Sequence, residues 1–269
     1  WRTTQAASTN QILVAGSAPE WVRVAQWTDT GGTTPVVYYS AYLSSDGSTW
    51  TLVPGSTQSF SMAGPLLAGT ATDSYNQGTA ASVAMDSIAV TAQEYGPPPG
   101  VCLASFTCQD IGGATPAGSQ TFSGSTISVA GGGGDIWDVS DQFHFVSQAF
   151  SGNADGTGDG SVSAHIASLT AGNTWAKSGV MLRASSDPGS PYYASFATQG
   201  NGIVVQYRTA QGGSTSQIPV SSATAPVWLE LVRYQDSSSG TPINYVTAYT
   251  SADGSTWTEV PGSTTEMDG

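Results

Sequence analysis

The 269-residue chain carries 6 Lys and Arg against 19 Asp and Glu, a formal net charge of −13. A surface this acidic repels phosphate backbones and anionic lipid headgroups, which argues against nucleic-acid and membrane-surface partners. Only 9% of the residues are charged while 39% are hydrophobic, so uncharged polar residues and glycine must cover the surface, as is typical of secreted β-proteins. No run of 18 apolar residues occurs, so no membrane-spanning helix is expected.

Short alternating runs of apolar and polar residues between turn signals predict β-strands along the whole chain. The first are expected at residues 20–27, 36–43 and 48–53, and Asp46-Gly47 predicts a hairpin turn because both residues tolerate positive φ. Further strands are expected at 121–130, 142–150, 160–169, 178–184, 192–198, 203–208, 227–234, 244–250 and 255–260. No stretch shows helical periodicity over ten residues, so the expected fold class is an all-β, antiparallel β-sandwich or jelly roll.

A proline-rich joint separates the two halves of the chain. Residues 95–108 contain three consecutive prolines at 97–99, which favour a stiff extended segment. Cys102 and Cys108 lie in the same stretch and flank a short apolar run. We expect a local disulfide between them, which implies an oxidising compartment and an extracellular or cell-surface location. Two free buried thiols are the alternative.

Two segments of the chain are copies of each other. Residues 21–57 align without gaps to residues 228–264, an offset of 207, with 19 identities over 37 positions. The run Asp46-Gly47-Ser48-Thr49-Trp50 recurs in full at 253–257, and residues 1–3 match 207–209 after a one-residue gap. Chance does not produce such agreement, so tandem repeats of about 207 residues are expected.

The phase of the repeat predicts three parts. Residues 1–94 are expected to be the C-terminal half of one sandwich repeat, 95–108 a linker with the cysteine pair, and 109–269 a second repeat without its last strands. A sandwich that lacks strands exposes core and an unpaired edge. The complement is either a continuation of the chain or the matching strands of another copy, in a donor-strand arrangement.

The chain from Asp110 onward carries motifs that resemble a known family. They include Gly134-Asp135-Ile136-Trp137, the run at 175–183 (WAKSGVMLR) and the Asp253–Trp257 hairpin. These motifs resemble the bacterial concanavalin A-like/laminin G-like jelly-roll modules of secreted and cell-surface proteins. Members of that fold include lectins, carbohydrate-binding modules, adhesion repeats and some glucanases, so the resemblance implies the fold and not a single function.

Catalytic groups are scarce. A glycosidase needs two carboxylates that face one cleft, and none of the five Glu lies in the E-x-D-x-E-like strand pattern that the glucanases of this fold use. The only histidines are His144 and His165. His144 lies between two phenylalanines on a predicted strand, which favours a structural role. We therefore expect a non-catalytic protein with no required cofactor.

One loop has the composition of a calcium site. Asn153, Asp155 and Asp159 lie among glycines, which let the backbone wrap closely around a hard cation that prefers oxygen ligands. No glutamate follows at the twelfth position, so the loop is not an EF-hand. An ordinary hairpin loop rich in Asp and Gly is the alternative.

A second acidic cluster predicts ion pairs. Asp135, Asp138 and Asp141 follow four glycines, and Arg183 and Lys177 are the expected cationic partners in a chain with few cations. Arg183 follows an apolar run, so its charge would need a carboxylate if it were buried. We favour a structural ion pair of Arg183 with Asp135 and Asp141 over a ligand site.

Aromatic rings supply the glycan-binding candidates. Carbohydrate recognition uses exposed rings together with polar groups, and the candidates are Trp137, Trp175, Tyr192 and Tyr193. Because Tyr192 and Tyr193 follow a loop, they are the pair expected to turn one ring outward.

Two functions compete at this point. The first is an extracellular structural or adhesive tandem-repeat protein, a link in a filament, stalk or adhesin whose partners are other copies of itself. The second is a carbohydrate-binding, lectin-like module of a secreted multidomain protein, with polysaccharide as its partner. We place the first ahead because the repeat, the stiff joint and the missing catalytic pair are all features of this chain.

Overall fold

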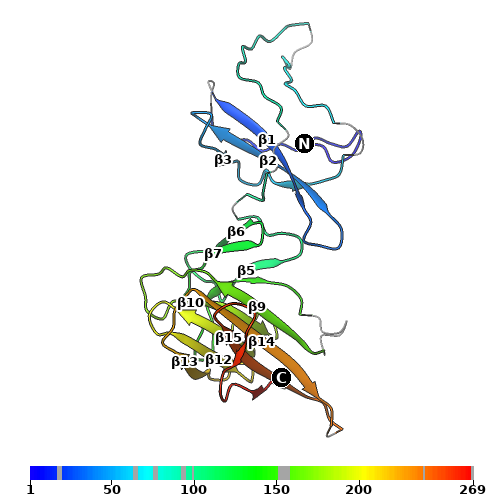
Figure 1. Ribbon diagram of the computed structural model, residues 1–269. Helices are drawn as coiled ribbons and strands as arrows, with labels where there is room; N and C mark the ends of the chain where they lie inside the picture. Colours follow the sequence, from blue (N-terminus) through cyan, green and yellow to red (C-terminus); the bar gives the residue numbers. More distant parts are fainter. Residues whose placement is uncertain are drawn as a thin grey trace. The chain divides into compact units, whose positions relative to one another are not determined.

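The structure is a computed structural model that describes residues 1–16, 20–62, 66–74, 78–91, 95–98, 100–150, 158–238 and 240–267. These residues form β-strands in antiparallel sheets and contain no helix (Figure 1). No helix long and apolar enough to cross a membrane occurs in them. The chain divides into a first unit, Trp1–Ser105 with Gln120–Ser128, and a second unit, Phe106–Ser119 with Val129–Gly269.

The first unit is built on one small sheet. Strand β1 (Trp21–Asp29) pairs with β2 (Val36–Ser44) along its whole length, and β3 (Thr51–Leu52) and β4 (Gln58–Ser59) both pair with β2. Strand β1 is therefore an edge of this sheet. A separate hairpin, β6 (Ser119–Ser123) with β7 (Thr126–Ala130), follows later in the chain.

The second unit contains three sheets. One pairs β5 with β8, one has the strand order β10-β11-β12-β13, and one has the order β16-β15-β14-β9, with β17 also paired to β15. Their bounds are β5 (Thr107–Ile111), β8 (Phe143–Ser147), β9 (Gly160–Ile166), β10 (Lys177–Arg183), β11 (Tyr192–Thr198), β12 (Ile203–Arg208), β13 (Ser216–Ser221), β14 (Val227–Asp236), β15 (Ile243–Ser251), β16 (Thr258–Glu259) and β17 (Thr265–Glu266).

The core of the second unit lies between two of these sheets. Alternate residues of β14 point inward, so Leu229 and Leu231 are both fully buried. They pack with Val180, Tyr193 and Val205 of the sheet that contains β10, β11 and β12. Full burial of one such leucine contributes about 1.5–3 kcal/mol. The packing is that of two facing sheets, as in a sandwich.

The all-β expectation is confirmed, and three local predictions need correction. The expected strand at 121–130 is a hairpin, because Gly124 has a φ of 58° and turns the chain between β6 and β7. Strands β5 and β13 were missed: β5 begins at Thr107, inside the segment expected to be a linker, and Ser and Pro interrupt the apolar pattern of β13. The first repeat has apolar runs at 66–68 and 82–90, which are the expected counterparts of the last strands that the second repeat lacks, but these residues form no strand and Leu67 is fully exposed.

The cysteine prediction is confirmed. Cys102 and Cys108 form a disulfide, and no free cysteine is present. The bond closes a short loop that ends inside β5, whose second residue is Cys108.

Candidate functional site: an open sheet face

The hairpins after β2 and β15 are held by the same hydrogen bonds. Asp46 Oδ1 accepts a hydrogen bond from the backbone N–H of Thr49 at 2.7 Å, and Asp253 Oδ1 accepts one from Thr256 at 2.7 Å. These backbone hydrogen bonds lower the pKa of both carboxyl groups, that of Asp253 to about 2. The copied residues therefore build copied local structure.

A tryptophan covers each of these hairpins in the same way. Gly47 and Gly254 have φ values of 71° and 73°, a region that favours glycine. A Cβ atom at Gly47 would lie 2.8 Å from the ring of Trp21, and one at Gly254 would lie 2.8 Å from the ring of Trp228. Glycine is thus required in both units by backbone conformation and by the ring above it.

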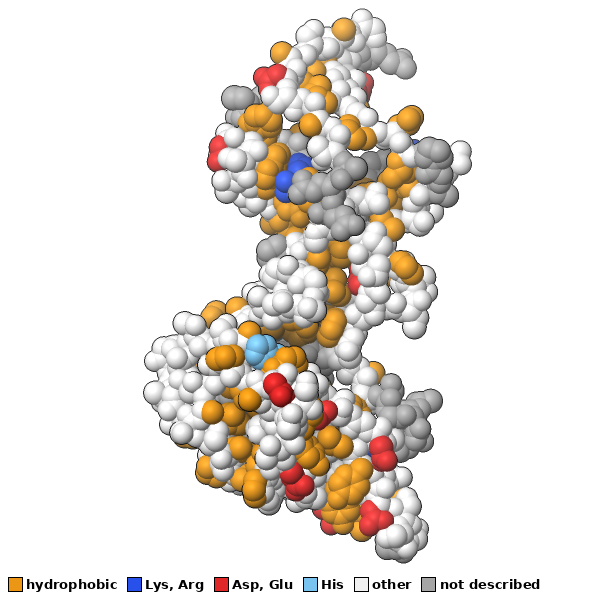
Figure 2. All heavy atoms as spheres, in the orientation of Figure 1, with side chains coloured by type: hydrophobic (Ala, Val, Ile, Leu, Met, Phe, Trp, Pro, Cys, Tyr) orange, Lys and Arg blue, Asp and Glu red, His pale blue; other side chains and the backbone are white. Residues whose placement is uncertain are grey.

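The inward faces of the two sheets differ sharply. In the second unit, Leu229 and Leu231 of β14 are 0% exposed. The residues at the equivalent positions of β1 are Val22 and Val24, which are 74% and 75% exposed. We call the surface of β1 that carries Val22 and Val24 the open face. Hydrophobic side chains on the surface appear in orange in Figure 2.

The free edge of β1 adds to this difference. Strand β14 pairs on one side with β15 and on the other with β9, where Leu229 lies opposite Ala164 and Leu231 opposite Val162. Strand β1 pairs with β2 alone within the described residues. An edge strand of nine residues presents unpaired N–H and C=O groups to any incoming strand.

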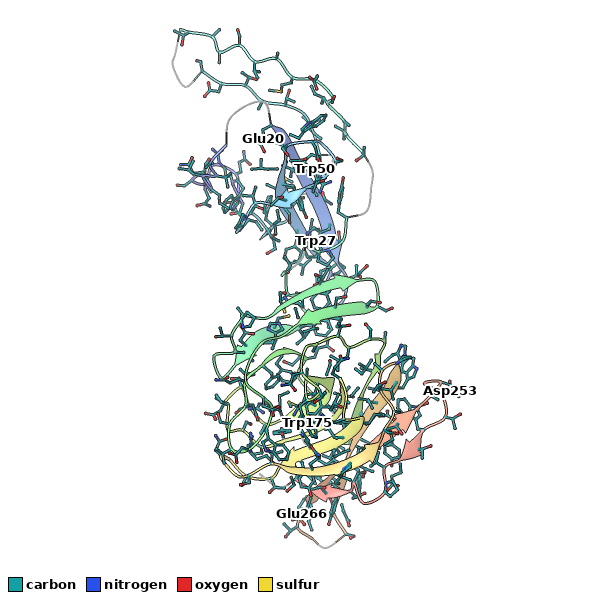
Figure 3. The ribbon with its side chains drawn as sticks, turned by 90° about the vertical axis from the view of Figure 1, so that its left-hand side faces the viewer. Glu20, Trp27, Trp50, Trp175, Asp253 and Glu266 are labelled. Atoms are coloured by element: carbon teal, nitrogen blue, oxygen red, sulfur yellow. The ribbon has the colours of Figure 1, made fainter. Side chains whose placement is uncertain are left out.

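On the outward faces the difference in burial is reversed: the first unit buries its residue and the second exposes its counterpart. Trp27, on the outer side of β1, is 3% exposed, whereas Tyr234 at the equivalent position of β14 is 38% exposed. Both rings stack on the facing tyrosine of the neighbouring strand, Tyr38 or Tyr245. Figure 3 shows Trp27 and Trp50 in the first unit.

Residues between 95 and 105 contact the outer face of the first unit. The Arg23 guanidinium lies over the rings of Trp50 at 4.3 Å and Tyr95 at 5.1 Å. The carboxylate of Asp29 accepts a hydrogen bond from the backbone N–H of Ala104 at 2.7 Å. The first unit therefore covers its outer face and leaves its inner face open, while the second unit covers its inner face.

The first fourteen residues repeat the end of the β12–β13 pair. Trp1 and Asn10 exchange two backbone hydrogen bonds, of 2.7 and 2.8 Å, and their counterparts Tyr207 and Ser216 are partners in that strand pair. Likewise the Arg2 guanidinium donates to Thr9 Oγ1 at 3.1 Å, as the guanidinium of Arg208 donates to Thr215 Oγ1 at 3.3 Å.

The two arginines lie in contrasting surroundings. Arg208 is 0% exposed, whereas Arg2 is exposed. The Arg208 Nη2 lies 2.8 Å from Asp141 Oδ1, and no ion pair of Arg2 is found in the described residues. Leu13 and Val14, which align with Pro219 and Val220 of β13, are 85% and 49% exposed.

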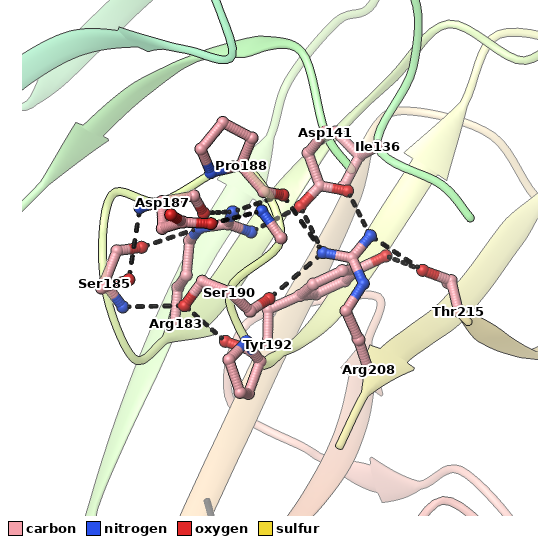
Figure 4. Close-up of polar contacts among 12 residues, drawn as sticks. Ile136, Asp141, Arg183, Ser185, Asp187, Pro188, Ser190, Tyr192, Arg208 and Thr215 are labelled. Atoms are coloured by element: carbon pink, nitrogen blue, oxygen red, sulfur yellow. Dashed lines mark hydrogen bonds and ion pairs between the residues drawn. The ribbon is translucent and has the colours of Figure 1, made fainter. Parts of the chain in front are cut away.

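A buried ion-pair network stabilises the loops at one end of the second unit (Figure 4). Asp141 is 0% exposed and pairs with Arg183 Nη1 at 2.6 Å and with Arg208 Nη2 at 2.8 Å. Backbone carbonyls of Asp138 and Pro188 accept further guanidinium hydrogen bonds. The predicted pair of Arg183 with Asp141 is present, and the network is structural because protein groups fill its hydrogen-bonding capacity.

Sequence reasoning missed Arg208 and misplaced Asp135. Arg208 ends an apolar strand in a chain with only six Lys and Arg, and that scarcity was the available signal. Lys177, the other expected cation, pairs with Asp135 at 2.8 Å, and the expected pair of Asp135 with Arg183 is not found among the described residues.

Tyr192 and Tyr193 are both 0% exposed, so the expectation that one ring points outward is wrong. Strand β11 lies between β10 and β12, and Tyr192 and Tyr193 belong to the core clusters on its two faces. Burial raises the pKa of Tyr192 to about 12. The two tyrosines are core residues.

Trp137 and Trp175 lie at the surface, 39% and 43% exposed. The Lys177 ammonium lies near both rings. It pairs with Asp135 and donates a hydrogen bond to the carbonyl of Ile136, next to Trp137, at 3.3 Å. It also lies 5.9 Å from the ring centre of Trp175. Figure 3 labels Trp175 in the second unit. Exposed rings beside an ion pair match the residue types that carbohydrate sites use.

The proposed calcium loop lies mostly outside the described residues, which omit Asn153 and Asp155. Asp159 is described, and its Oδ1 accepts a hydrogen bond from the backbone N–H of Gln235 at 2.8 Å. Among the residues that the structure describes, no group of three or more His, Cys, Asp or Glu is arranged to hold a metal ion.

His144 occupies a structural position. Its Nδ1 lies 2.8 Å from Asp110 Oδ1, and this hydrogen bond is the main cause of the lowered pKa of Asp110. Asp110 also accepts a hydrogen bond from the backbone N–H of Gly118, where a Cβ atom would lie 2.2 Å from the imidazole. The pair links β5 and β8 to the loop before β6.

No family model matches the chain, and neither a curated protein nor a solved structure matches it.

Proposed function

We propose that the chain is a non-catalytic, extracellular structural or adhesive protein, built as a link in a filament, stalk or adhesin. Its units are proposed to be jelly-roll modules of the concanavalin A-like/laminin G-like kind, repeated about every 207 residues. The observation that carries the proposal is the exposure of Val22 and Val24 where the second unit buries leucines. An apolar sheet face of this kind marks an interaction surface.

Three further features support this function. The two hairpins share their sequence and their hydrogen bonds, as repeated modules require. The disulfide of Cys102 and Cys108 suits an oxidising location. Charged residues are few, and acidic residues outnumber basic ones, which suits a solvated extracellular surface.

Immunogold electron microscopy with antibodies against the chain tests the location and the assembly. On intact, unpermeabilised cells of the source organism, we expect label on the cell surface or along extracellular fibres. Pre-immune serum is the control for non-specific label. Label confined to the cytoplasm would contradict the proposal.

A carbohydrate-binding module is the second candidate, favoured by the exposed Trp137 and Trp175 beside the Lys177–Asp135 pair. A glycan array with the intact chain tests it. Selective binding that Trp175→Ala abolishes would support this function. Tyr234→Ala is the matched control, because Tyr234 is equally exposed but lies on β14.

A further inference from the structure

We propose that the open face and free edge of β1, together with residues 1–14, form a docking surface for a half-sandwich of the kind formed by strands β5 and β8–β12 of the second unit. The incoming segment would place a β9-like strand antiparallel to β1 and a carboxylate of the Asp141 type beside Arg2. The inference rests on the proposed function only in treating the chain as built from repeated modules.

The second unit shows what covers such a face. There β9 pairs with the edge of β14, and the sheet of β10–β13 packs on the inward face, where Leu229 and Leu231 lie. In the first unit, the counterparts of β13, β14 and β15 are present in the sequence, and the covering strands are what the surface lacks. The occupant is therefore a segment that resembles β5–β12.

The register follows from the same comparison. Residues of β9 lie opposite β14 as Ala164 with Leu229 and Val162 with Leu231. By equivalence, Val22 would face an alanine-like residue and Val24 a valine-like one. Small and β-branched side chains at these places let the two strands and the facing sheet approach closely.

The side-chain volumes on the inward face of the first unit are compatible with this occupant. The first unit has valines where the second has Leu229 and Leu231, but it has Tyr39 and Phe60 in place of Val246 and Met267. Tyr39 and Phe60 stack with ring centres 4.5 Å apart. Smaller residues on β1 are thus offset by larger ones beside it, and cores tolerate such exchanges when the total volume is kept.

The charge of Arg2 adds a second, independent requirement. Its counterpart Arg208 is fully buried because Asp141 neutralises it through a hydrogen-bonded ion pair. Arg2 already makes the matching contact to Thr9. A carboxylate that arrives with the occupant would complete the site, and Val14, whose counterpart Val220 packs against the core of the second unit, would be covered by the strand that pairs beside it.

An intact second copy does not fit this surface. Its own β9–β13 strands already cover β14 and β15. To donate them it would have to expose Leu229 and Leu231, which are 0% exposed. The structure therefore favours a separate segment of the same kind over a symmetric dimer.

The test extends the full chain at its N-terminus with a second copy of residues 106–206, so that Trp1 follows Gln206 as Tyr207 does. Hydrogen–deuterium exchange is followed in β1, with β14 of the same molecule as the internal reference. We expect the amides of β1 to exchange ~100-fold more slowly than in the unextended chain, approaching the rate of β14. Unchanged exchange in β1 with an unchanged β14 would overturn the proposal.

Two variants sharpen the test. In the extended chain, Val24→Lys should restore fast exchange in β1 and leave β14 protected. Arg2→Ala should lower the melting temperature of the extended chain and leave that of the unextended chain unchanged. Absence of both effects would overturn the proposed contacts.

Light scattering of the unextended chain tests the alternative occupant, a second copy of the same chain. A stable dimer with protected β1 amides would overturn the proposal in favour of a second copy. A monomer with fast exchange in β1 supports it. Neither result bears on where the protein is located, so this test can fail while the immunogold test of the proposed function succeeds.

Discussion

The hairpins of the two units have the same local hydrogen bonds, whereas strands β1 and β14 have opposite burial. Their Asp-Gly turns use the same backbone donors at the same distances. Yet Val24 is 75% exposed where Leu231 is 0% exposed, and Trp27 is 3% exposed where Tyr234 is 38% exposed. Hydrogen bonds between residues close in sequence form wherever that sequence occurs. Burial depends on partners that arrive from distant parts of a chain.

The largest expected effect comes from the buried ion-pair network of the second unit, which has no equivalent among the described residues of the first. Asp141→Ala removes the carboxylate that forms ion pairs with both Arg183 and Arg208, whose side chains are almost fully buried. We expect the free energy of unfolding of the second unit to fall by about 3–5 kcal/mol, as measured by chemical denaturation. Asp135→Asn is the control, since Asp135 is half exposed, and its loss should cost about 1 kcal/mol or less. Equal losses would refute the assigned role of the network.

The next prediction concerns the inward faces directly. Leu231→Ala should destabilise the second unit by about 2–5 kcal/mol, because it leaves a cavity in a packed core. Val24→Ala at the equivalent position should change stability by no more than about 0.5 kcal/mol, since Val24 is largely exposed. Denaturant titration of both variants measures the difference. A large loss for Val24→Ala would show that the first unit buries this residue in solution.

The hairpin glycines should respond alike in the two units. Gly47→Ala and Gly254→Ala each force an L side chain into positive φ and against a tryptophan ring. We expect each to destabilise its own hairpin by about 1–2 kcal/mol. Amide exchange of the two turns, measured separately, checks this. If only one turn loosens, the local equivalence of the hairpins is wrong.

The smallest effect is a pH dependence of the Asp253 turn. The folded-state pKa of Asp253 is lowered to about 2 from an ordinary value of 3.8 by hydrogen bonds from Thr256 and Ser255. A lowered pKa means that the ionised form stabilises the turn above about pH 4, and that this contribution is lost as the pH falls through about 2.

NMR titration of the Asp253 carboxyl carbon measures this pKa directly, and Asp253→Asn is the control that removes the titration. Asp46, whose pKa is lowered by the same hydrogen bonds, should follow it. A midpoint near 3.8 for either residue would contradict the hydrogen bonding described for its turn.

Several features of the fold were predictable because they depend on nearby residues. Alternating apolar residues predicted most strands, and Asp-Gly predicted both hairpin turns. The spacing of Cys102 and Cys108 predicted the disulfide. The acidic cluster and the scarce cations predicted that Arg183 would pair with Asp141.

Other features were not predictable because they depend on what packs from a distance. The position of Tyr192 and Tyr193 after a loop suggested exposure, but strands on both sides and side chains on both faces bury them. Asp135 and Asp141 lie six residues apart, yet Asp135 pairs with Lys177, whereas Asp141 pairs with Arg183 and Arg208. Lys177 and Arg183 lie at opposite ends of β10, and Arg208 comes from β12. The separation of two residues along the sequence does not tell which side chains they will contact in the folded protein.

The amino-acid sequence by itself determined the strands, the turns, the disulfide and the duplication, since each follows from residues that are neighbours along the chain. The tertiary structure alone decided which face of each duplicated sheet is covered. The same apolar alternation places side chains on one side of β1 and of β14, but only contacts with distant strands remove them from water. That is why Leu231 is a core residue and Val24 a surface residue.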